Sequence, residues 1–386
     1  MPIWLRYAIG AQACLLVGMG IGRFGYAPMI PVLIESGQLA EFETGRVGAL
    51  NLAGYVLGAV ATARLRHRWH EAAVLRTCLV LALLSLVASI LPFGYLWLAS
   101  WRLLVGIVVA VMMILGISYV TRFAPPDRVA RATSIAFSGV GLGIFFSAVG
   151  LPFLLDAGVA AAWAGAAAVG AVATGVGLWA WSGAPRLEAT HVPEHRVRIP
   201  VEGWKLVAAQ FLFSVGLIPH SIYWVDYIVR GLGHPMSHGA LHWTLVGAGA
   251  VLGTLLWGRL ADRIGLTPGL VVIFAMLSAS IALPVLAPGG LVLLFSSLVF
   301  GSQPGSSAVI AGRAQQVMGT GAMTPLWRWM TISVGAAQLL GAPVLVELFN
   351  RTGSHTPVFL AGGTAMALAS VLCATLPRDA DATGRT

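Results

Sequence analysis

Long apolar segments alternate with short polar connections along the whole chain. Each apolar segment has about 20 residues, the length that a helix needs to cross roughly 30 Å of hydrocarbon. The pattern therefore predicts an all-α membrane protein with twelve transmembrane helices. The predicted spans are residues 7–34, 45–64, 72–92, 95–120, 133–155, 158–181, 203–229, 240–258, 267–287, 290–312, 324–348 and 356–376.

The composition agrees with a chain that lives in lipid. Of the 386 residues, 58% are hydrophobic and only 10% are charged, whereas a soluble domain carries about 25% charged residues. This excludes a soluble enzyme, a secreted disulfide module and a disordered tail. The sequence contains no Walker loop, no nucleophile elbow and no HExxH motif. We therefore expect no enzyme activity and no cofactor, and a gradient as the energy source for any transport.

The basic residues are unevenly distributed between the two ends of the predicted spans. Of the 23 Lys and Arg, eighteen fall on the side that holds both termini. Three fall on the opposite side, and Arg23 and Arg102 fall within spans. This bias predicts a multi-pass protein of the bacterial inner membrane with both termini in the cytoplasm. The net charge of +9 is then explained by contact with anionic lipid, so we expect the bilayer as a partner and no nucleic acid.

An internal repeat relates the second span to the eighth. The stretch that begins at Ala53 matches the stretch that begins at Ala248 in eight of sixteen positions, at an offset of 195 residues. The offset is about half the chain, which predicts two parallel six-helix bundles with a central site between them. The predicted domains are residues 1–182 and 201–386, joined by a cytoplasmic linker at 183–200. We expect a monomer.

The eighth span ends in an octet, residues 258–265, with glycine at both ends and an acid between two arginines. It resembles the signature loop G-x-L-a-D-r-x-G of the major facilitator superfamily of transporters. The resemblance implies the major facilitator fold and secondary transport by alternating access. The alternative is a plain cytoplasmic turn with a solvated charge pair. In the first half, His67 replaces the acid. The implied gating residues are Gly258, Arg259, Asp262, Arg263 and Gly265.

Arg102 lies in the fourth span, four residues before Gly106. A charge at depth in a bilayer costs at least ~2.5 kcal/mol, so it should face the interior of the bundle and have a partner. The alternative is an arginine that extends to the outer interface beside Trp97 and Trp101. The pattern resembles the R-x-x-x-G motif of the superfamily, which implies a buried role in proton coupling or gating.

Arg23 lies near the middle of the first span, among four glycines and before Pro28. Glycine and proline loosen the helix and let a solute approach the backbone. A fixed positive charge there would attract an anion, with Tyr26 nearby as a second binding residue. The alternative is an ion pair with an acid such as Asp226. The stretch Gly-Arg-Phe-Gly-Tyr-Ala-Pro is similar to the YbfB/YjiJ-like branch of the superfamily.

The seventh span carries polar and aromatic groups on one helical face, because His220, Tyr223, Trp224 and Tyr227 are spaced at i, i+3, i+4 and i+7. We predict that His220, Tyr223 and Trp224 bind solute, together with Gln338 of the eleventh span. Asp226 and His220 are candidate proton carriers. The alternatives are an Asp226 capped by Arg230 at i+4 and a histidine satisfied within the core.

These features predict a secondary transporter of a small solute, an organic anion on the evidence of Arg23, coupled to H⁺. One alternative is an H⁺-coupled efflux pump for drugs or metabolites. A copper importer is another, because His234, Met236, His238 and His242 lie close together in the sequence. A third is a transport-inactive sensor. The Gln303-Pro304-Gly305 sequence is expected to break the tenth helix.

Overall fold

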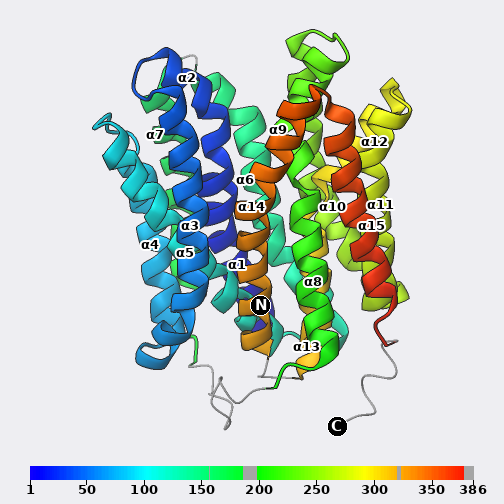
Figure 1. Cartoon of the computed structure of the whole chain (residues 1–386). Coiled ribbons are helices and arrows are strands. Elements are labelled where there is room, and N and C mark those ends of the chain that lie inside the picture. The colour runs from blue at the N-terminus through cyan, green and yellow to red at the C-terminus, as the bar shows by residue number, and fades with distance from the viewer. Residues whose placement is uncertain (156, 186–197, 320–322, 378–386) are drawn as a thin grey trace. The chain divides into compact units, whose positions relative to one another are not determined.

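The computed structural model describes residues 1–155, 157–185, 198–319 and 323–377, and these ranges hold helices and no strand. The chain divides into two compact units, Met1–Val192 and Pro193–Thr386. The first runs from blue through cyan and the second from green to red in Figure 1. Of the expected linker 183–200, residues 186–197 lie outside the described ranges.

Within the described ranges, ten helices are long and apolar enough to cross a membrane. Two further pairs of helices pass the same test as bent pairs, which gives up to twelve spans if each pair is one span. The all-α membrane fold predicted from the apolar segments is therefore confirmed.

The first span of unit 1 is not one continuous helix. It is divided into α1 (Ile3–Leu15), the π-helical segment η1 (Leu16–Arg23), the 3-10 segment η2 (Phe24–Met29) and α2 (Ile30–Glu35). The predicted span 7–34 therefore begins four residues after the start of α1. The prediction also did not include the π-helical and 3-10 segments within the span. The other helices of unit 1 are α3 (Glu41–Arg68), α4 (Glu71–Ala88), α5 (Tyr95–Phe123), α6 (Val129–Leu155) and α7 (Val159–Ala180).

Unit 2 begins with a span in three parts, because Pro219 starts a new helix after Gly216. The predicted break in the tenth span is confirmed: the chain bends by 42° between α12 and α13, where Pro304 lacks an N–H for the helix ladder. The helices are α8 (Val201–Gly216), α9 (Ile218–Asp226), η5 (Tyr227–Gly231), α10 (Met236–Ile264), α11 (Leu266–Leu286), α12 (Gly290–Gly301), α13 (Pro304–Met318), α14 (Met323–Thr352) and α15 (His355–Ala374).

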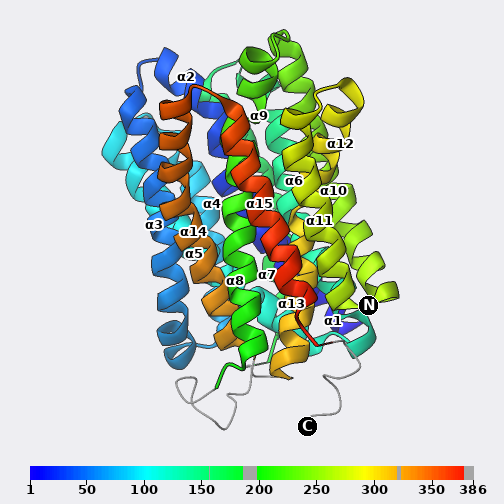
Figure 2. The ribbon, with the colours of Figure 1, turned by 45° about the vertical axis from the view of Figure 1, so that its right-hand side comes forward.

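Helices α3 and α5 of unit 1 cross closely and lie side by side (Figure 1, Figure 2). A Cβ added to Gly54 would lie 2.2 Å from the carbonyl oxygen of Leu103. In unit 2, a Cβ added to Gly249 would likewise lie 2.2 Å from the carbonyl oxygen of Leu298. Both members of the second pair follow those of the first by 195 residues.

The opposite helix of each pair also carries a glycine at the crossing. A Cβ on Gly106 would lie 2.1 Å from the carbonyl oxygen of Asn51, and one on Gly301 would lie 2.1 Å from that of Val246. The same offset of 195 residues relates these two contacts. Each unit therefore builds its core from the same close helix crossing, so the repeat seen in the sequence is also a repeat of packing.

Candidate functional site

Arg102 of α5 is buried against the broken first span of unit 1. Only 2% of it is exposed. Its guanidinium donates one hydrogen bond to the main-chain carbonyl of Gly22 and another, of 3.2 Å, to that of Arg23. The first span changes from π-helical to 3-10 geometry directly after these two residues. Arg102 therefore binds the main chain where the helix type changes, and its burial rules out the alternative of an arginine that extends to the interface.

The other contacts of Arg102 are aromatic. Its Cζ lies 4.8 Å from the ring centre of Tyr26 and 6.0 Å from that of Trp163. Asn51 of α3 donates to the main-chain carbonyl of Arg102 at 2.9 Å, which ties α3 to the same place. Among the described residues, the groups that contact the Arg102 guanidinium are thus carbonyl dipoles and π faces. Its positive charge is stabilised without being neutralised by a carboxylate.

Arg23 is half-buried next to Arg102. Its Cζ lies 5.4 Å from the ring centre of Tyr55 on α3 and 5.5 Å from that of Phe24. The charges of Arg23 and Arg102 are close enough to interact. Two residues that the sequence assigned to different roles therefore belong to one cationic site in unit 1.

Tyr26 is placed in this site as the sequence suggested, but its hydroxyl is already used. It donates to the main-chain carbonyl of Thr44 at 3.2 Å, and only 4% of the residue is exposed. Its aromatic ring makes the cation–π contact with the Arg102 guanidinium. The predicted contact of Tyr26 with solute stays a prediction.

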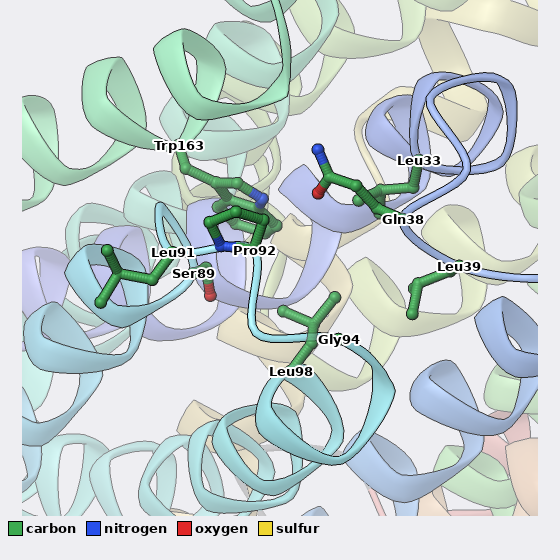
Figure 3. Close-up of a pocket in the computed structure, with 9 residues that line it drawn as sticks. All are labelled: Leu33, Gln38, Leu39, Ser89, Leu91, Pro92, Gly94, Leu98 and Trp163. Atoms are coloured by element: carbon green, nitrogen blue, oxygen red, sulfur yellow. The ribbon is translucent and has the colours of Figure 1, made fainter.

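Figure 3 shows a pocket in unit 1 that is lined in part by the connection between α4 and α5. Trp163 lines this pocket and is also the ring beneath Arg102. The lining carries no charged side chain, so the pocket by itself does not select an ion. The residues that line it are Leu33, Gln38, Leu39, Ser89, Leu91, Pro92, Gly94, Leu98 and Trp163.

In unit 2, the polar and aromatic face predicted on the seventh span is buried. His220 is stacked between the rings of Trp224 and Phe300, with centroid distances of 4.3 Å to each. Its Nε2 lies 2.8 Å from the hydroxyl of Ser296. Tyr227 donates its hydroxyl to the carbonyl of Pro284 at 2.6 Å. The face is built as predicted, and its binding of solute stays a prediction.

Asp226 lies beside this face in a different set of contacts. Its Oδ1 accepts a hydrogen bond from Arg230, and its Oδ2 lies 2.7 Å from Nε2 of His355 at the start of α15. Tyr223 packs near the same imidazole, with a ring centroid distance of 6.1 Å. The alternative of an Asp226 capped by Arg230 is therefore what the structure shows, with His355 as a partner that sequence spacing did not reveal.

The octet at the end of α10 forms a turn into α11. Gly265 has φ of +97°, a conformation that glycine adopts without steric cost. Gly258 is buried, and Arg259, Asp262 and Arg263 are exposed. In unit 1, where His67 replaces the acid, Glu71 pairs with Arg66 at 3.2 Å and is only 1% exposed. An acid four residues after His67 is therefore paired with an arginine of this loop.

The remaining predicted residues lie on α14 and on α10 with the connection before it. Gln338 is half-buried on α14. The rings of His234 and His238 lie 5.1 Å apart, while Nδ1 of His242 lies 2.9 Å from the hydroxyl of Ser297. The side chain of Met236 lies outside the described part of the chain. Within that part, no group of three His, Cys, Asp or Glu is arranged to hold a metal ion.

With this geometry established, comparison with known proteins decides the family. A family model described as "Uncharacterised MFS-type transporter YbfB" matches residues 15–374. The chain belongs to this family. It is therefore a multi-pass membrane transporter of the MFS type, in agreement with the resemblance of its first-span and octet motifs. No protein of curated function matches the chain significantly.

Solved structures of MFS transporters share the fold of this family member. A bacterial homologue of the iron transporter ferroportin, in an outward-facing state, is 14% identical with a TM-score of 0.74 and full coverage, 100% of both chains. The E. coli fucose:proton symporter FucP is 13% identical with a TM-score of 0.74, covering 97% of this chain and 99% of FucP. A second FucP structure, in the outward conformation, has a TM-score of 0.75 at 13% identity, covering 95% and 97%. Identities this low show the fold alone.

Sequence reasoning assigned no role to three residues of these clusters, two in unit 1 and one in unit 2. Asn51 and Tyr55 come from α3, and their i, i+4 spacing in an otherwise apolar span was the available signal. His355 follows a polar connection, and nothing in the sequence around it indicated a partner. Its pairing with Asp226 spans 129 residues and depends on how α15 packs against α9.

Proposed function

We propose that this MFS-type transporter moves a small organic anion across the bacterial cytoplasmic membrane by alternating access, with H⁺ as the coupling ion. The observation that carries the proposal is the cationic site of unit 1. Arg23 and Arg102 bring two positive charges together, and the described partners of Arg102 carry no formal negative charge. Such a site in apolar surroundings favours an anion over a neutral or cationic solute.

Coupling to H⁺ is supported by three observations. The chain contains no motif for ATP, and titratable side chains lie within its seventh span. FucP, which shares the fold, is a fucose:proton symporter by its own description. His220, Asp226 and Arg102 are the proposed coupling residues. Gly258, Arg259, Asp262, Arg263 and Gly265 are the proposed gate, and Tyr26, Tyr223, Trp224 and Gln338 are proposed to contact solute.

The proposed arrangement in the membrane rests on the distribution of basic residues. Eighteen of 23 Lys and Arg lie on the side of the two termini in the predicted topology, so both termini are placed in the cytoplasm. We further propose that residues 1–182 and 201–386 are the two transport domains and that the monomer is the functional form.

Transport in proteoliposomes tests this function. Purified protein is reconstituted, and uptake of labelled succinate, citrate and gluconate is measured with and without an inward proton gradient. Uptake driven by the gradient is expected for at least one anion. It is expected to be lost in Arg23→Gln and partly kept in Arg23→Lys, which keeps the charge but not the planar fork.

The same assay separates the alternatives. Gradient-driven uptake of a neutral sugar, unaffected by Arg23→Gln, would overturn the anion proposal. Proton-driven extrusion of amphipathic cations would favour the efflux pump. Failure to move any probe, by a protein that remains folded, would favour the transport-inactive sensor.

A further inference from the structure

His220 is a buried imidazole with one nitrogen satisfied and one not. The residue is 1% exposed, on α9 within the seventh span. Its Nε2 contacts the hydroxyl of Ser296 on α12 at 2.8 Å. Its Nδ1 is buried and has no hydrogen-bond partner among the described residues. A buried polar atom in this state costs free energy, so its retention calls for a role.

Ser296 determines which nitrogen of His220 carries the proton. The Ser296 hydroxyl donates its single proton to the main-chain carbonyl of Ser280, at 2.6 Å. It can therefore only accept from His220, so Nε2 is the protonated nitrogen of the neutral ring. Nδ1 is left with a lone pair, which is the one position on this side chain where a further proton can bind.

The surroundings of the ring suit a cation that carries no carboxylate partner. Trp224 and Phe300 stack on its two sides at 4.3 Å, with interplanar angles of 19° and 23°. Phe359 of α15 lies 5.2 Å away. Aromatic faces attract a cation through their quadrupole, and they do so more strongly where water is excluded. The rings can thus stabilise an imidazolium without neutralising its charge.

The titratable groups around His220 are engaged elsewhere. Tyr227 donates its hydroxyl to Pro284, and Asp226 is paired with Arg230 and His355. From α10, His242 contacts Ser297, whose hydroxyl also accepts from Trp224 at 3.2 Å. The groups of α9, α12 and α15 that touch the His220 ring are Trp224, Ser296, Phe300 and Phe359, none of which is charged.

We infer that His220 is the proton-carrying residue of this transporter, that it takes the coupling proton on Nδ1, and that Ser296 is its positioning residue. The inference rests on the proposed proton coupling and selects one of its candidates. A proton from the aqueous phase binds the Nδ1 lone pair, the neutral ring becomes an imidazolium, and release of the same proton restores it. Asp226 and Arg102 then serve as structural partners of His355 and of the first span.

Nuclear magnetic resonance of the full chain in lipid nanodiscs, with isotope-labelled histidine nitrogens, tests the assignment. The His220 signals are identified by their loss in His220→Gln and, in a variant that keeps the ring, by their shift in Ser296→Ala. At about pH 8.5 we expect a proton on Nε2 and a bare Nδ1. On lowering the pH to about 4.5, which brackets the usual titration of histidine, Nδ1 should gain a proton.

Ser296→Ala provides the readout for positioning. Without the hydroxyl, the neutral His220 ring should show a mixture of both tautomers, whereas Ser296→Thr should keep the single Nε2-protonated form. Asp226→Asn should leave the His220 titration in place. A neutral ring protonated on Nδ1, or an Nδ1 that stays bare over the whole pH range, would overturn the inference.

A flux measurement separates this inference from the proposed function. Proteoliposomes loaded with a pH-sensitive dye receive succinate, citrate or gluconate. The unmodified protein is expected to move labelled anion and protons together, and His220→Gln is expected to lose the proton movement. If no anion is moved by either protein, the proposed function fails. The protonation of His220 on Nδ1 is then still decided by the nuclear magnetic resonance data. If His220→Gln moves protons at the unmodified rate, the inference fails and the transport function survives.

Discussion

The guanidinium of Arg102 donates to the main-chain carbonyl of Arg23 at 3.2 Å, so one intramembrane arginine positions the backbone of the other. The first span changes from π-helical to 3-10 geometry between Arg23 and Phe24. Arg102 satisfies carbonyls at this change, which keeps the first span irregular at the point where Arg23 projects. The two arginines are therefore linked by a side-chain to main-chain hydrogen bond as well as by the interaction of their charges.

Replacing Arg102 by lysine should destabilise the protein although the charge is kept. A lysine ammonium cannot reproduce the planar fork that reaches two carbonyls, and a buried acceptor left unpaired costs about 1–3 kcal/mol. Unfolding in mixed micelles measures the loss. Arg128→Lys is the control, because the side chain of Arg128 is 51% exposed. Equal stability of the two variants would contradict the capping role of Arg102.

Alanine at the crossing glycines should destabilise both units. The new Cβ of Gly54→Ala or Gly249→Ala would lie 2.2 Å from a main-chain oxygen of the facing helix, so the helices must separate. Gly175→Ala on α7 is the matched control, since its Cβ would meet nothing within 4 Å. There alanine should be neutral or stabilising by up to about 1 kcal/mol. Unfolding midpoints that fall equally in all three variants would argue against the shared crossing.

The Tyr55 ring is expected to tune anion binding through Arg23. Tyr55→Phe keeps the face that lies 5.4 Å from the Arg23 guanidinium, and Tyr55→Leu removes it. The loss of a cation–π contact is expected to cost about 0.5–2 kcal/mol. Binding of the transported probe anion should therefore be near normal in Tyr55→Phe and several-fold weaker in Tyr55→Leu. Identical affinities in two equally stable variants would place Tyr55 outside the site.

The pair of Asp226 and His355 should act as a structural link between α9 and α15. Asp226→Asn and His355→Gln should each lower the unfolding temperature, and the double variant should lose less than the two losses combined, because either change breaks the same contact. Arg230→Gln should have a small effect, since the Arg230 side chain is 73% exposed. Loss of proton flux in Asp226→Asn, with stability unchanged, would assign the coupling role to Asp226.

The sequence determined the fold class and the repeat. Segment length and apolarity determine that the spans are helices, because a helix satisfies every backbone group in lipid. The repeat was visible at Gly54 and Gly249, where a Cβ would lie 2.2 Å from a main-chain oxygen of the facing helix. The break at Pro304 followed in the same way from proline's missing N–H. These features depend on local chemistry and so can be read from the chain alone.

Tertiary packing decided which polar residues share a site. Arg102 could be expected to need a buried partner, but that the partners are the carbonyls of Gly22 and Arg23 depends on how α5 lies against the first span. Likewise, Asp226 meets His355, and His220 meets Ser296, only through contacts between helices distant in sequence. Helical periodicity assigns a side chain to a face of its own helix, whereas the group opposite that face is set by the packing of the neighbouring helix.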